Sequence, residues 1–337
     1  MKESSGNWHI SLAHGSGGKL THDLIKNHFS TEFKNPILSA LADSAVLNLN
    51  GTRLAFTTDS HVIKPLFYPG GDIGKLAVYG TVNDLAVVGA KPLYISCAYV
   101  VEEGFDGESL DRITRSLAEA ARTAGVIVVT GDTKVVEHGK GDGIFINTSG
   151  IGICNYTLPQ DIEIGDKILI NGTIGDHEIA IISARGELGL NLKLESDCAP
   201  LADLISHVLT TSGKIKFMRD PTRGGLATTL NEIVEERDFG VIIDEGTIPV
   251  REEVKGVCSL LGFDPLYLAN EGKVVIIVGR EDASKVLDVM RVHPLGMGSQ
   301  IIGEIIESPE GRVCLKTEIG GTRIVDMPVG TQLPRIC

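Results

Sequence analysis

The sequence predicts an α/β protein of two domains joined by a short linker. Three observations support this fold class. Short apolar runs alternate with segments of helical period, the alternation occurs twice, and a polar stretch at residues 155–167 separates the two series. A chain of 337 residues is long for one small domain and suits two. We therefore expect two α/β domains in succession.

The first part of the chain divides into an arm and a domain. Residues 1–35 are polar and glycine-rich, so we expect a flexible arm that leads into a helix near Thr21. The first domain is expected over residues 36–155. Apolar residues recur at helical spacing over two of its segments, 71–89 and 109–125. Its strands are expected at residues 53–59, 92–101, 125–132 and 144–153.

The second domain is expected over residues 156–325, with a tail behind it. The patterns predict strands at 167–172 and 273–279, with helices at 177–187 and 222–237. Two further strand candidates are QIIGEI, which starts at Gln300, and RVCLKT, which starts at Arg312. Residues 326–337 contain two prolines and no helical period. They form an expected extended tail that can reach about 40 Å at ~3.3 Å per residue.

Composition limits the partners and the compartment. The chain has 31 Lys and Arg against 44 Asp and Glu, a net charge of −13, which argues against a nucleic-acid or anionic-membrane binder. No apolar run approaches the roughly 20 residues that span a bilayer. The six cysteines are dispersed and form no CxxC pair. We expect a soluble, cytoplasmic protein that binds neither nucleic acid nor membrane.

Asp84 is the most informative single residue. In the expected helix over residues 71–89 it lies seven residues after Ala77 and four after Gly80, which at about 3.6 residues per turn is the apolar face. A carboxylate on a buried stripe is costly unless it is paired or binds a metal. Two interpretations stay open: a ligand-binding acid, or a buried aspartate that caps a neighbouring loop.

Three further aspartates lie beside expected strands. Asp59 and Asp132 each close a strand, and Asp43 precedes the apolar stretch AVLNL. Strand ends in an α/β fold often converge on one edge, where ligands bind, although each aspartate alone is also a common turn residue. Together they predict a magnesium site formed by Asp43, Asp59, Asp84 and Asp132. Bound cations reverse the local charge, so a metal-bridged phosphate such as a nucleoside triphosphate is expected.

The phosphate contacts are less defined. The chain has neither a complete Walker motif nor a GxGxxG after a strand. HGSGGK at 14–19 either wraps phosphate with backbone N–H groups or belongs to the arm. Lys134 is a phosphate contact, a proton-handling group or a solvated lysine. Asp220 precedes two glycines at an expected helix start, which favours an anion or is simply a cap.

Several motifs resemble the ATP-binding superfamily of aminoimidazole ribonucleotide synthetase, selenophosphate synthetase and thiamine monophosphate kinase. They are TTDS at 57–60, the block at 71–92, TGDTKVV at 130–136 and DPTRGGLATTLNEI at 220–233. Within that superfamily, other motifs resemble its hydrogenase maturation branch. These are HGSGGK, NEGK at 270–273, HPLG at 293–296 and the final PRIC.

The resemblance implies a two-domain PurM-like fold with mixed sheets. Its N-terminal domain would pair with that of a second subunit, giving a homodimer, and its C-terminal domain would cover the nucleotide. The implied cofactors are ATP and Mg²⁺. The residues implied to bind ATP are Thr58, Asp59, Lys75, Asn83, Asp84, Asp132, Lys134 and Asp220.

In the hydrogenase maturation branch the reactant is a cysteine at the chain end, which here is Cys337. The resemblance implies that the carbamoyltransferase HypF loads this thiol with a carbamoyl group. ATP-dependent dehydration then yields a protein thiocyanate. The cyano group passes to iron held by the HypC–HypD complex and becomes a ligand of the NiFe-hydrogenase centre.

This chemistry needs groups that accept two protons. Glu271 in the NEG turn is the first candidate base, with His14 and Lys134 behind it. Each has a simpler alternative: Glu271 can bond loop N–H groups, and His14 can be an exposed arm residue. Arg335 can offset the charge near the Cys337 thiol or dock the tail against an acidic cleft.

Two competing functions remain. The first is another enzyme of the superfamily, but selenophosphate synthetase places a reactive cysteine or selenocysteine in the arm, where this chain has His14 and no cysteine. Aminoimidazole ribonucleotide synthetase or thiamine monophosphate kinase activity would leave Cys337 without a purpose. The second is a non-catalytic carrier that presents Cys337 and uses ATP only as a conformational effector.

Overall fold

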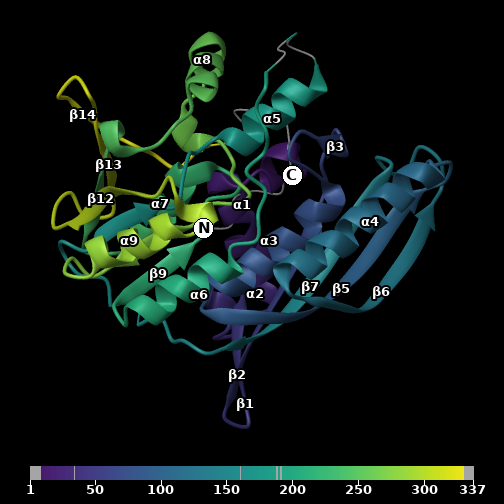
Figure 1. The fold of residues 1–337 in the computed structure, drawn as a ribbon, viewed down its shortest axis with the longest axis horizontal. Coiled ribbons are helices and arrows are strands. Elements are labelled where there is room, and N and C mark those ends of the chain that lie inside the picture. The colour runs from purple at the N-terminus through teal and green to yellow at the C-terminus, as the bar shows by residue number, and fades with distance from the viewer. Residues whose placement is uncertain (1–8, 34, 160, 187–188, 190–191, 330–337) are drawn as a thin grey trace.

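The computed structural model describes residues 9–33, 35–159, 161–186, 189 and 192–329, and these form two α/β halves, each built on one large mixed sheet (Figure 1). In the described residues the first sheet has five strands in the order β1–β2–β7–β5–β6. Their bounds are β1 Ala45–Leu49, β2 Thr52–His61, β5 Ala90–Glu102, β6 Ile127–Val136 and β7 Ile144–Cys154. The four strands expected in this region are therefore confirmed, and β1 is an addition to them.

Pairing in the first sheet is antiparallel except between β5 and β6. The parallel pair is connected by α4 (Gly107–Ala124), which begins after the N-cap Asp106 and ends at Gly125 with φ 70°. Helices α3 (Ile73–Val87) and α4 pack on one face of the sheet and share its apolar core. The spacing of apolar residues predicted helices at 71–89 and 109–125, and α3 and α4 confirm both.

Helix α3 is buried on all sides. Of its fifteen residues only Lys75 and Asp84 are not buried. The helix therefore has no polar face, because the sheet, α4 and the second half of the chain surround it. We expected Asp84 to lie on one apolar face of a helix whose other face is polar, and the structure corrects this expectation. Asp84 belongs to a helix that is apolar all round, which is typical of a helix in the centre of a protein.

The second half is a sheet covered on both faces. Its described strands follow the order β14–β13–β10–β12–β8–β11–β9. Helix α7 (Gly225–Val234) packs on one face, and α6 (Ala202–Thr211) and α9 (Ala283–Val292) pack on the other. The strand bounds are β8 Lys167–Ile170, β9 Ile215–Arg219, β10 Gly240–Asp244, β11 Val275–Val278, β12 Gln300–Ile306, β13 Val313–Lys316 and β14 Thr322–Ile324.

Several elements of this half agree with the sequence patterns. Strands β8, β11, β12 and β13 and helices α5 (Asp176–Arg185) and α7 lie within or close to the expected ranges. The patterns did not predict α6, α8 (Glu252–Leu261), α9, β9, β10 or β14. The small remaining elements are β3 Phe67–Tyr68, β4 Gly71–Asp72, η4 Glu245–Thr247, η5 Pro265–Tyr267 and η6 Pro294–Gly296.

The described part of the N-terminal segment is helical and contacts the second half. Short helices follow one another over η1 Leu12–Gly15, α1 Gly18–Leu24, η2 Ile25–Phe29, α2 Ser30–Glu32 and η3 Leu38–Ala40. The expected helix near Thr21 thus begins three residues earlier, at Gly18. Arg223 Nη1 donates to the carbonyl of Gly15 at 2.9 Å, and Lys19 N donates to the carbonyl of Pro328 at 3.0 Å.

One buried amide ties the two halves together. Asn83 on α3 donates from Nδ2 to the carbonyls of Ala199 and Glu271, at 3.1 and 3.3 Å. Its Oδ1 accepts from the N–H of Leu201 at 2.8 Å. These three partners all lie in the second half, so the amide satisfies backbone groups that the contact between the halves buries.

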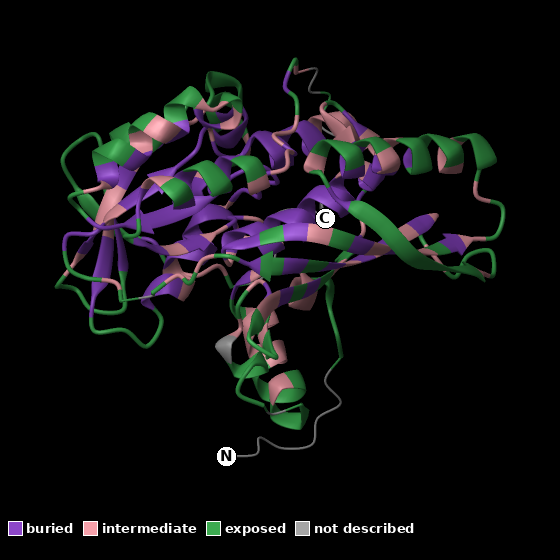
Figure 2. Cartoon of the chain, turned by 60° about the horizontal axis from the view of Figure 1, so that its bottom comes forward, coloured by how far each residue is buried: buried purple, intermediate pink, exposed green. Residues whose placement is uncertain are grey.

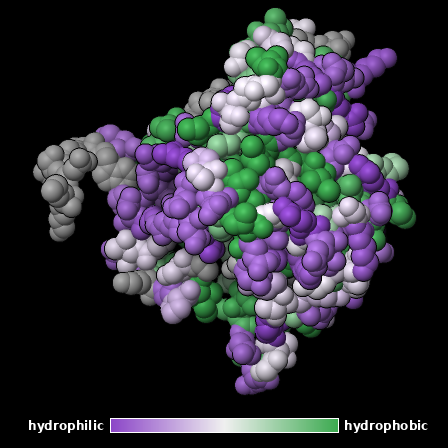
Figure 3. Space-filling model, turned by 90° about the vertical axis from the view of Figure 1, so that its left-hand side faces the viewer, coloured by the Kyte–Doolittle hydropathy of each residue, from purple (hydrophilic) through white to green (hydrophobic). Residues whose placement is uncertain are grey.

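The outer surface differs between the two halves. Nine of the ten residues of β6 are exposed, and one edge strand of the first sheet is exposed along most of its length in Figure 2. Figure 3 views the side of the second half on which β12–β14 lie, where hydrophilic side chains surround scattered hydrophobic ones. None of the helices in the described ranges is both long and apolar enough to cross a bilayer.

Replacing Asn83 by Ala should destabilise the protein strongly. Each buried backbone group left without a partner costs about 1–3 kcal/mol, so loss of three partners should lower the free energy of unfolding by about 3 kcal/mol or more. Urea denaturation measures this change. The control is Asn48→Ala on the exposed strand β1, for which we expect a change within about 0.5 kcal/mol. Equal losses for both variants would contradict this role of Asn83.

Candidate functional site

A cleft of about 500 Å³ lies between the two halves, and acidic side chains gather in its lining. Six carboxylates face two arginines among its described lining residues. The carboxylates are those of Asp43, Asp59, Asp84, Asp220, Glu232 and Glu271, and the arginines are Arg219 and Arg223. Because both halves contribute carboxylates, their contact is what assembles the site.

Strand β2 and helix α3 carry two of these acids. Asp59 points to the same side of β2 as Thr57 and His61, since side chains alternate along a strand. The hydroxyl of Thr57 donates to Asp84 Oδ2 at 2.9 Å. Gly80 lets the strand approach the helix, because a Cβ there would lie 3.0 Å from the His61 ring and 3.2 Å from Asp59 Oδ2. The absent side chain at Gly80 therefore brings Asp59 close to α3.

Arg219 holds Asp43 in place. Its Nε donates to Asp43 Oδ1 at 2.9 Å, and its Nη1 donates to Glu232 Oε2 at 2.7 Å. Arg219 also donates to the carbonyl of Leu41 at 3.0 Å. This buried guanidinium joins the segment before β1 to β9 and α7, and it is paired with two of the six carboxylates.

The second half supplies Asp220 and Glu271. Asp220 follows directly after β9, and Glu271 stands in the NEG turn before β11. The turn is fixed by Asp197, whose Oδ1 accepts from the N–H of Glu271 at 3.1 Å and whose Oδ2 pairs with Lys273 at 3.0 Å. Both acids are buried, so the backbone and not solvent sets their positions.

The crowded acids have altered protonation. Burial raises the pKa of Asp84 well above its ordinary value, and nearby Asp220, Asp43 and Asp59 raise it further. Burial and then Asp43 raise the pKa of Asp220 to about 7. Burial likewise raises the pKa of Glu271 well above its usual range, with Asp59 the next cause. Burial lowers the pKa of His61, which keeps that ring neutral at physiological pH.

Both ends of the described chain meet at the rim of the cleft. Gly17 and Gly18 line it, and Pro328 lies directly against Gly18. A Cβ on Gly18, whose φ is 70°, would stand only 2.5 Å from the carbonyl oxygen of Pro328. Glycine is therefore required here for the two segments to touch. HGSGGK thus supplies part of the cleft wall, while His14 itself is half-buried beside Ser11 and is not among the lining residues.

The structure brings together six of the eleven expected site residues that lie in its described part. Among those proposed from the sequence, the following line the cleft: Asp43, Thr58, Asp59, Asp84, Asp220 and Glu271. Lys75 and Asn83 do not line it. Lys75 Nζ donates to the carbonyl of Gly70 at 2.8 Å, and Asn83 joins the two halves. Cys337 and Arg335 lie outside the described residues.

Asp132 and Lys134 are the main departures from the expected cluster. They lie on the exposed edge strand β6 and pair with each other at 2.8 Å. Strands β5 and β7 separate β6 from β2, so Asp132 is three strand spacings of ~4.8 Å, about 14 Å in all, from Asp59. Within one chain Asp132 therefore stands apart from the other three aspartates, and its part in a metal site stays a prediction. Asp220 and Glu271 occupy the cleft instead.

The lining residues that sequence reasoning missed include Thr57, His61, Arg219, Arg223 and Glu232. A signal existed for Thr57 and His61, because both lie two residues from Asp59 on the same side of an expected strand. Arg219 precedes Asp220 directly in the RDPTRGG motif, yet its role depends on two acids far away in the chain. Nothing local marks such a pairing.

The donor set fits a magnesium ion. All candidate ligands are carboxylate oxygens, which Mg²⁺ prefers, and the described cleft contains no cysteine. Arg219 pairs with Asp43 and Glu232, so the other four carboxyl groups remain to bind a cation. Asp59, Asp84 and Asp220 are the residues that would hold the cation, which would offset the charge of a nucleotide phosphate there.

Comparison with known proteins agrees with this geometry. The AIR synthase related protein N-terminal domain matches residues 41–154, and the corresponding C-terminal domain matches residues 163–316. Carbamoyl dehydratase HypE of Cupriavidus necator is 48% identical over 336 residues, covering 97% of this chain and 95% of that protein. Carbamoyl dehydratase HypE of Escherichia coli K12 is 46% identical, covering 97% and 99%.

Solved structures give the same result and confirm the two-domain PurM-like fold. A crystal structure of a HypE–HypF complex aligns with a TM-score of 0.85 and 49% identity over 90% of this chain and 99% of that one. Hydrogenase maturation protein HypE in complex with ATP aligns with a TM-score of 0.81 and 46% identity over 98% and 100%. With both domains matched and nearly half of its residues identical over almost the full length, the chain belongs to the AIR synthase related family, in its carbamoyl dehydratase HypE branch.

Proposed function

We propose that this chain is an ATP-dependent carbamoyl dehydratase that converts an S-carboxamide on Cys337 into a thiocyanate. The γ-phosphoryl group passes to the carboxamide oxygen, and the C–O bond then breaks, so that oxygen leaves as phosphate. The nitrogen loses two protons and the carbon–nitrogen bond becomes triple. The sum is carboxamide plus ATP to thiocyanate, ADP, phosphate and a proton, with no change of oxidation state.

The observation that carries this proposal is the acidic cleft built from both halves. Carboxylates alone would repel ATP, whereas carboxylates that hold Mg²⁺ attract its phosphates. Asp59 and Asp84 come from the first half and Asp220 from the second. A cation at this junction would neutralise charge on the transferred phosphoryl group. Arg223, which also lines the cleft, supplies a positive charge of the chain itself.

The course of the described tail supports Cys337 as the reactant. Asn231 Nδ2 donates to the carbonyl of Val325 at 2.9 Å, and the hydroxyl of Tyr267 donates to that of Asp326 at 2.9 Å. These bonds direct the chain toward the rim, where Pro328 meets Gly18. Eight residues, ending with Cys337, follow Val329, enough to span about 26 Å at ~3.3 Å per residue. The Cys337 thiol is therefore within reach of the cleft.

Glu271 is the proposed base for proton removal. It is buried at the cleft wall, and burial raises its pKa, which makes its carboxylate a stronger base. His14 and Lys134 are the further candidates. Lys134 lies on β6, away from this cleft within one chain, so a role in the reaction requires a second copy.

We also propose that the chain forms a homodimer through its first sheet. Strand β6 exposes Ile127, Val129 and Val135 to 61%, 57% and 68%. The open face of the same sheet exposes further large apolar side chains, namely Phe56, Tyr94, Ile151 and Ile153. An apolar sheet face with an unpaired edge strand is typical of an interface. A second copy would cover it and shield Asp132 and Lys134 from solvent.

The proposed partners follow from the same chemistry. A complex of a similar HypE with HypF is known, and we propose that HypF carbamoylates Cys337 here as well. The thiocyanate is then proposed to deliver its cyano group to iron on a HypC–HypD complex. The alternative of a non-catalytic carrier would need neither the buried Glu271 nor ADP formation.

Binding of Mg²⁺ and nucleotide should release protons and strengthen as pH rises through about 7. Asp220 has a pKa near 7 and burial raises the pKa of Asp84, whereas a cation needs both carboxyl groups ionised. We expect affinity for Mg²⁺ with a non-hydrolysable ATP analogue to fall about tenfold from pH 8 to pH 6. Calorimetry in buffers of different ionisation enthalpy measures how many protons are released on binding.

The variant for this test is Asp84→Asn, which should weaken binding and release fewer protons without lowering the stability of the free protein. Its control is Asp288→Asn, an exposed acid on α9 outside the cleft. Affinity independent of pH, or equal behaviour of the two variants, would contradict the metal role of the cleft.

Cys337 and Glu271 should act at separate steps. After incubation with HypF, carbamoyl phosphate and ATP, the intact mass of the parent protein should show a gain of one carbamoyl unit and then the loss of one water. Cys337→Ala should gain nothing. Glu271→Gln should load normally and dehydrate at least 100-fold more slowly, because it cannot take a proton. Glu307→Gln, an exposed acid, is the matched control. Loading of Cys337→Ala, or normal dehydration by Glu271→Gln, would refute the assignments.

Light scattering at micromolar concentration should give the mass of two chains. Val129→Asp on β6 should shift the protein to monomers, since a dimer would bury that charge without a partner. Val292→Asp is the control, because Val292 is 87% exposed and lies on the opposite half. A monomeric parent protein, or dissociation of both variants, would count against this interface.

A further inference from the structure

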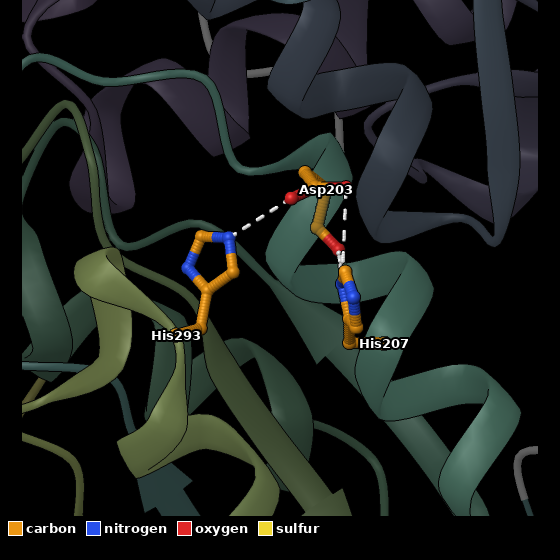
Figure 4. Close-up of side chains that lie close together, drawn as sticks. All are labelled: Asp203, His207 and His293. Carbon is orange, nitrogen blue, oxygen red and sulfur yellow. Dashed lines mark hydrogen bonds and ion pairs between the residues drawn. The ribbon is translucent and has the colours of Figure 1, made fainter.

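We propose that Asp203, His207 and His293 form a binding site for a divalent transition-metal ion, separate from the acidic cleft. One ligand atom from each of the three residues lies within 4.8 Å of the other two. Asp203 and His207 project from α6, and His293 follows the last residue of α9 (Figure 4). Nothing in the proposed dehydration uses these residues.

The helix sets the spacing of the first two ligands. Asp203 and His207 are four residues apart, so they lie one above the other on α6. The His207 ring is oriented by its Nδ1, which lies 2.8 Å from the carbonyl oxygen of Asp203 and 3.7 Å from Asp203 Oδ1. If Nδ1 donates to this carbonyl, the Nε2 lone pair is available to a metal. The side chains are 75% and 56% exposed, so both can adjust around an ion.

His293 completes the trio from a different element. Its Nε2 lies 3.1 Å from Asp203 Oδ2, and its ring centre is 5.8 Å from that of His207. Figure 4 shows the two imidazoles on either side of the carboxylate. The His293 side chain is only 13% exposed, so it is the most firmly placed of the three. Histidines from α6 and from the end of α9 thus lie beside the Asp203 carboxylate.

The ligand atoms of these three residues determine which metal ions the site can bind. Two imidazole nitrogens and one carboxylate suit Zn²⁺, Co²⁺, Ni²⁺ and Cu²⁺, whereas Mg²⁺ prefers oxygen alone. The candidate ligands of the cleft are carboxylates, so the two sites should bind different ions. Three protein ligands leave the remaining coordination positions to water, which is typical of an accessible metal site and not of a closed structural one.

Metal binding changes one hydrogen bond. At present the Nδ1 of His293 accepts from the N–H of Leu295 at 3.1 Å, which puts the ring proton on Nε2, toward Asp203. A metal on Nε2 requires that this proton move to Nδ1, so the Leu295 N–H loses its acceptor. No proton is gained or lost in this exchange. Leu295 is half-buried, and water can replace the lost acceptor.

A metal at this position would join two elements that cover the same face of the second sheet. Asp203 stands two residues after Leu201, whose N–H bonds to Asn83 beside Asp84. The ion would therefore connect α6 to the end of α9 and leave the cleft residues in place. We expect bound metal to raise the melting temperature of the protein.

The test uses the full chain with Cys337→Ala in every sample, which removes a competing thiolate. Millimolar Mg²⁺ is present to occupy the cleft. Calorimetry with Zn²⁺ and the visible absorption of Co²⁺ should both report one ion per chain that depends on the trio. Asp203→Asn and His207→Ala should each weaken Zn²⁺ binding by tenfold or more.

The deciding variant is His293→Asn. Asparagine is a good N-cap residue and keeps an acceptor for the Leu295 N–H, but it offers no imidazole. We expect at least tenfold weaker Zn²⁺ binding and loss of the rise in melting temperature. The control is His138→Ala, an exposed histidine on the other half, which should bind as the parent does. No Zn²⁺ binding by the parent, or undiminished binding by His293→Asn, would overturn the proposal.

Discussion

The concentration of carboxylates between the two halves is the constraint on which the rest of the structure depends. Six acids line one cleft, and Arg219 pairs with only two of them. Burial raises the pKa of Asp84 and Glu271 because the charged forms are poorly solvated there. Such a cluster lowers the stability of the chain at neutral pH, and a bound cation would restore it.

Helix α3 relates this cluster to the fold. Two adjacent residues of this helix have different roles. Asn83 bonds the backbone of the second half, and Asp84 faces the cleft. One turn earlier, Gly80 leaves room for Asp59 on β2. Because α3 is buried all round, none of these three positions can move independently. The contact between the halves and the geometry of the site are therefore one structural feature.

The carboxylates of the cleft and the paired histidines of the second half lie in different places. The cleft has oxygen donors and meets the ends of the described chain, where Gly18 contacts Pro328. The imidazole nitrogens of His207 and His293 lie together on the outside of the second half. The two proposed sites would therefore take different ions, Mg²⁺ in the cleft and a transition-metal ion at the two histidines. The exposed strand β6 forms a third surface, which a second copy is proposed to cover.

The sequence by itself determined the α/β class, most strands of the first sheet, both of its helices and the acids Asp43, Asp59, Asp84 and Asp220. These follow from local signals, because the periods of 2 and 3.6 residues and the motifs are properties of short segments. The tertiary structure alone decided that Asp132 leaves the cluster, that Asn83 is a link between the halves, and that Arg219 pairs with Asp43 and Glu232. It also brought His293 to Asp203. Strand order and contacts between distant segments set these positions, and no local pattern encodes a contact across 90 or 176 residues.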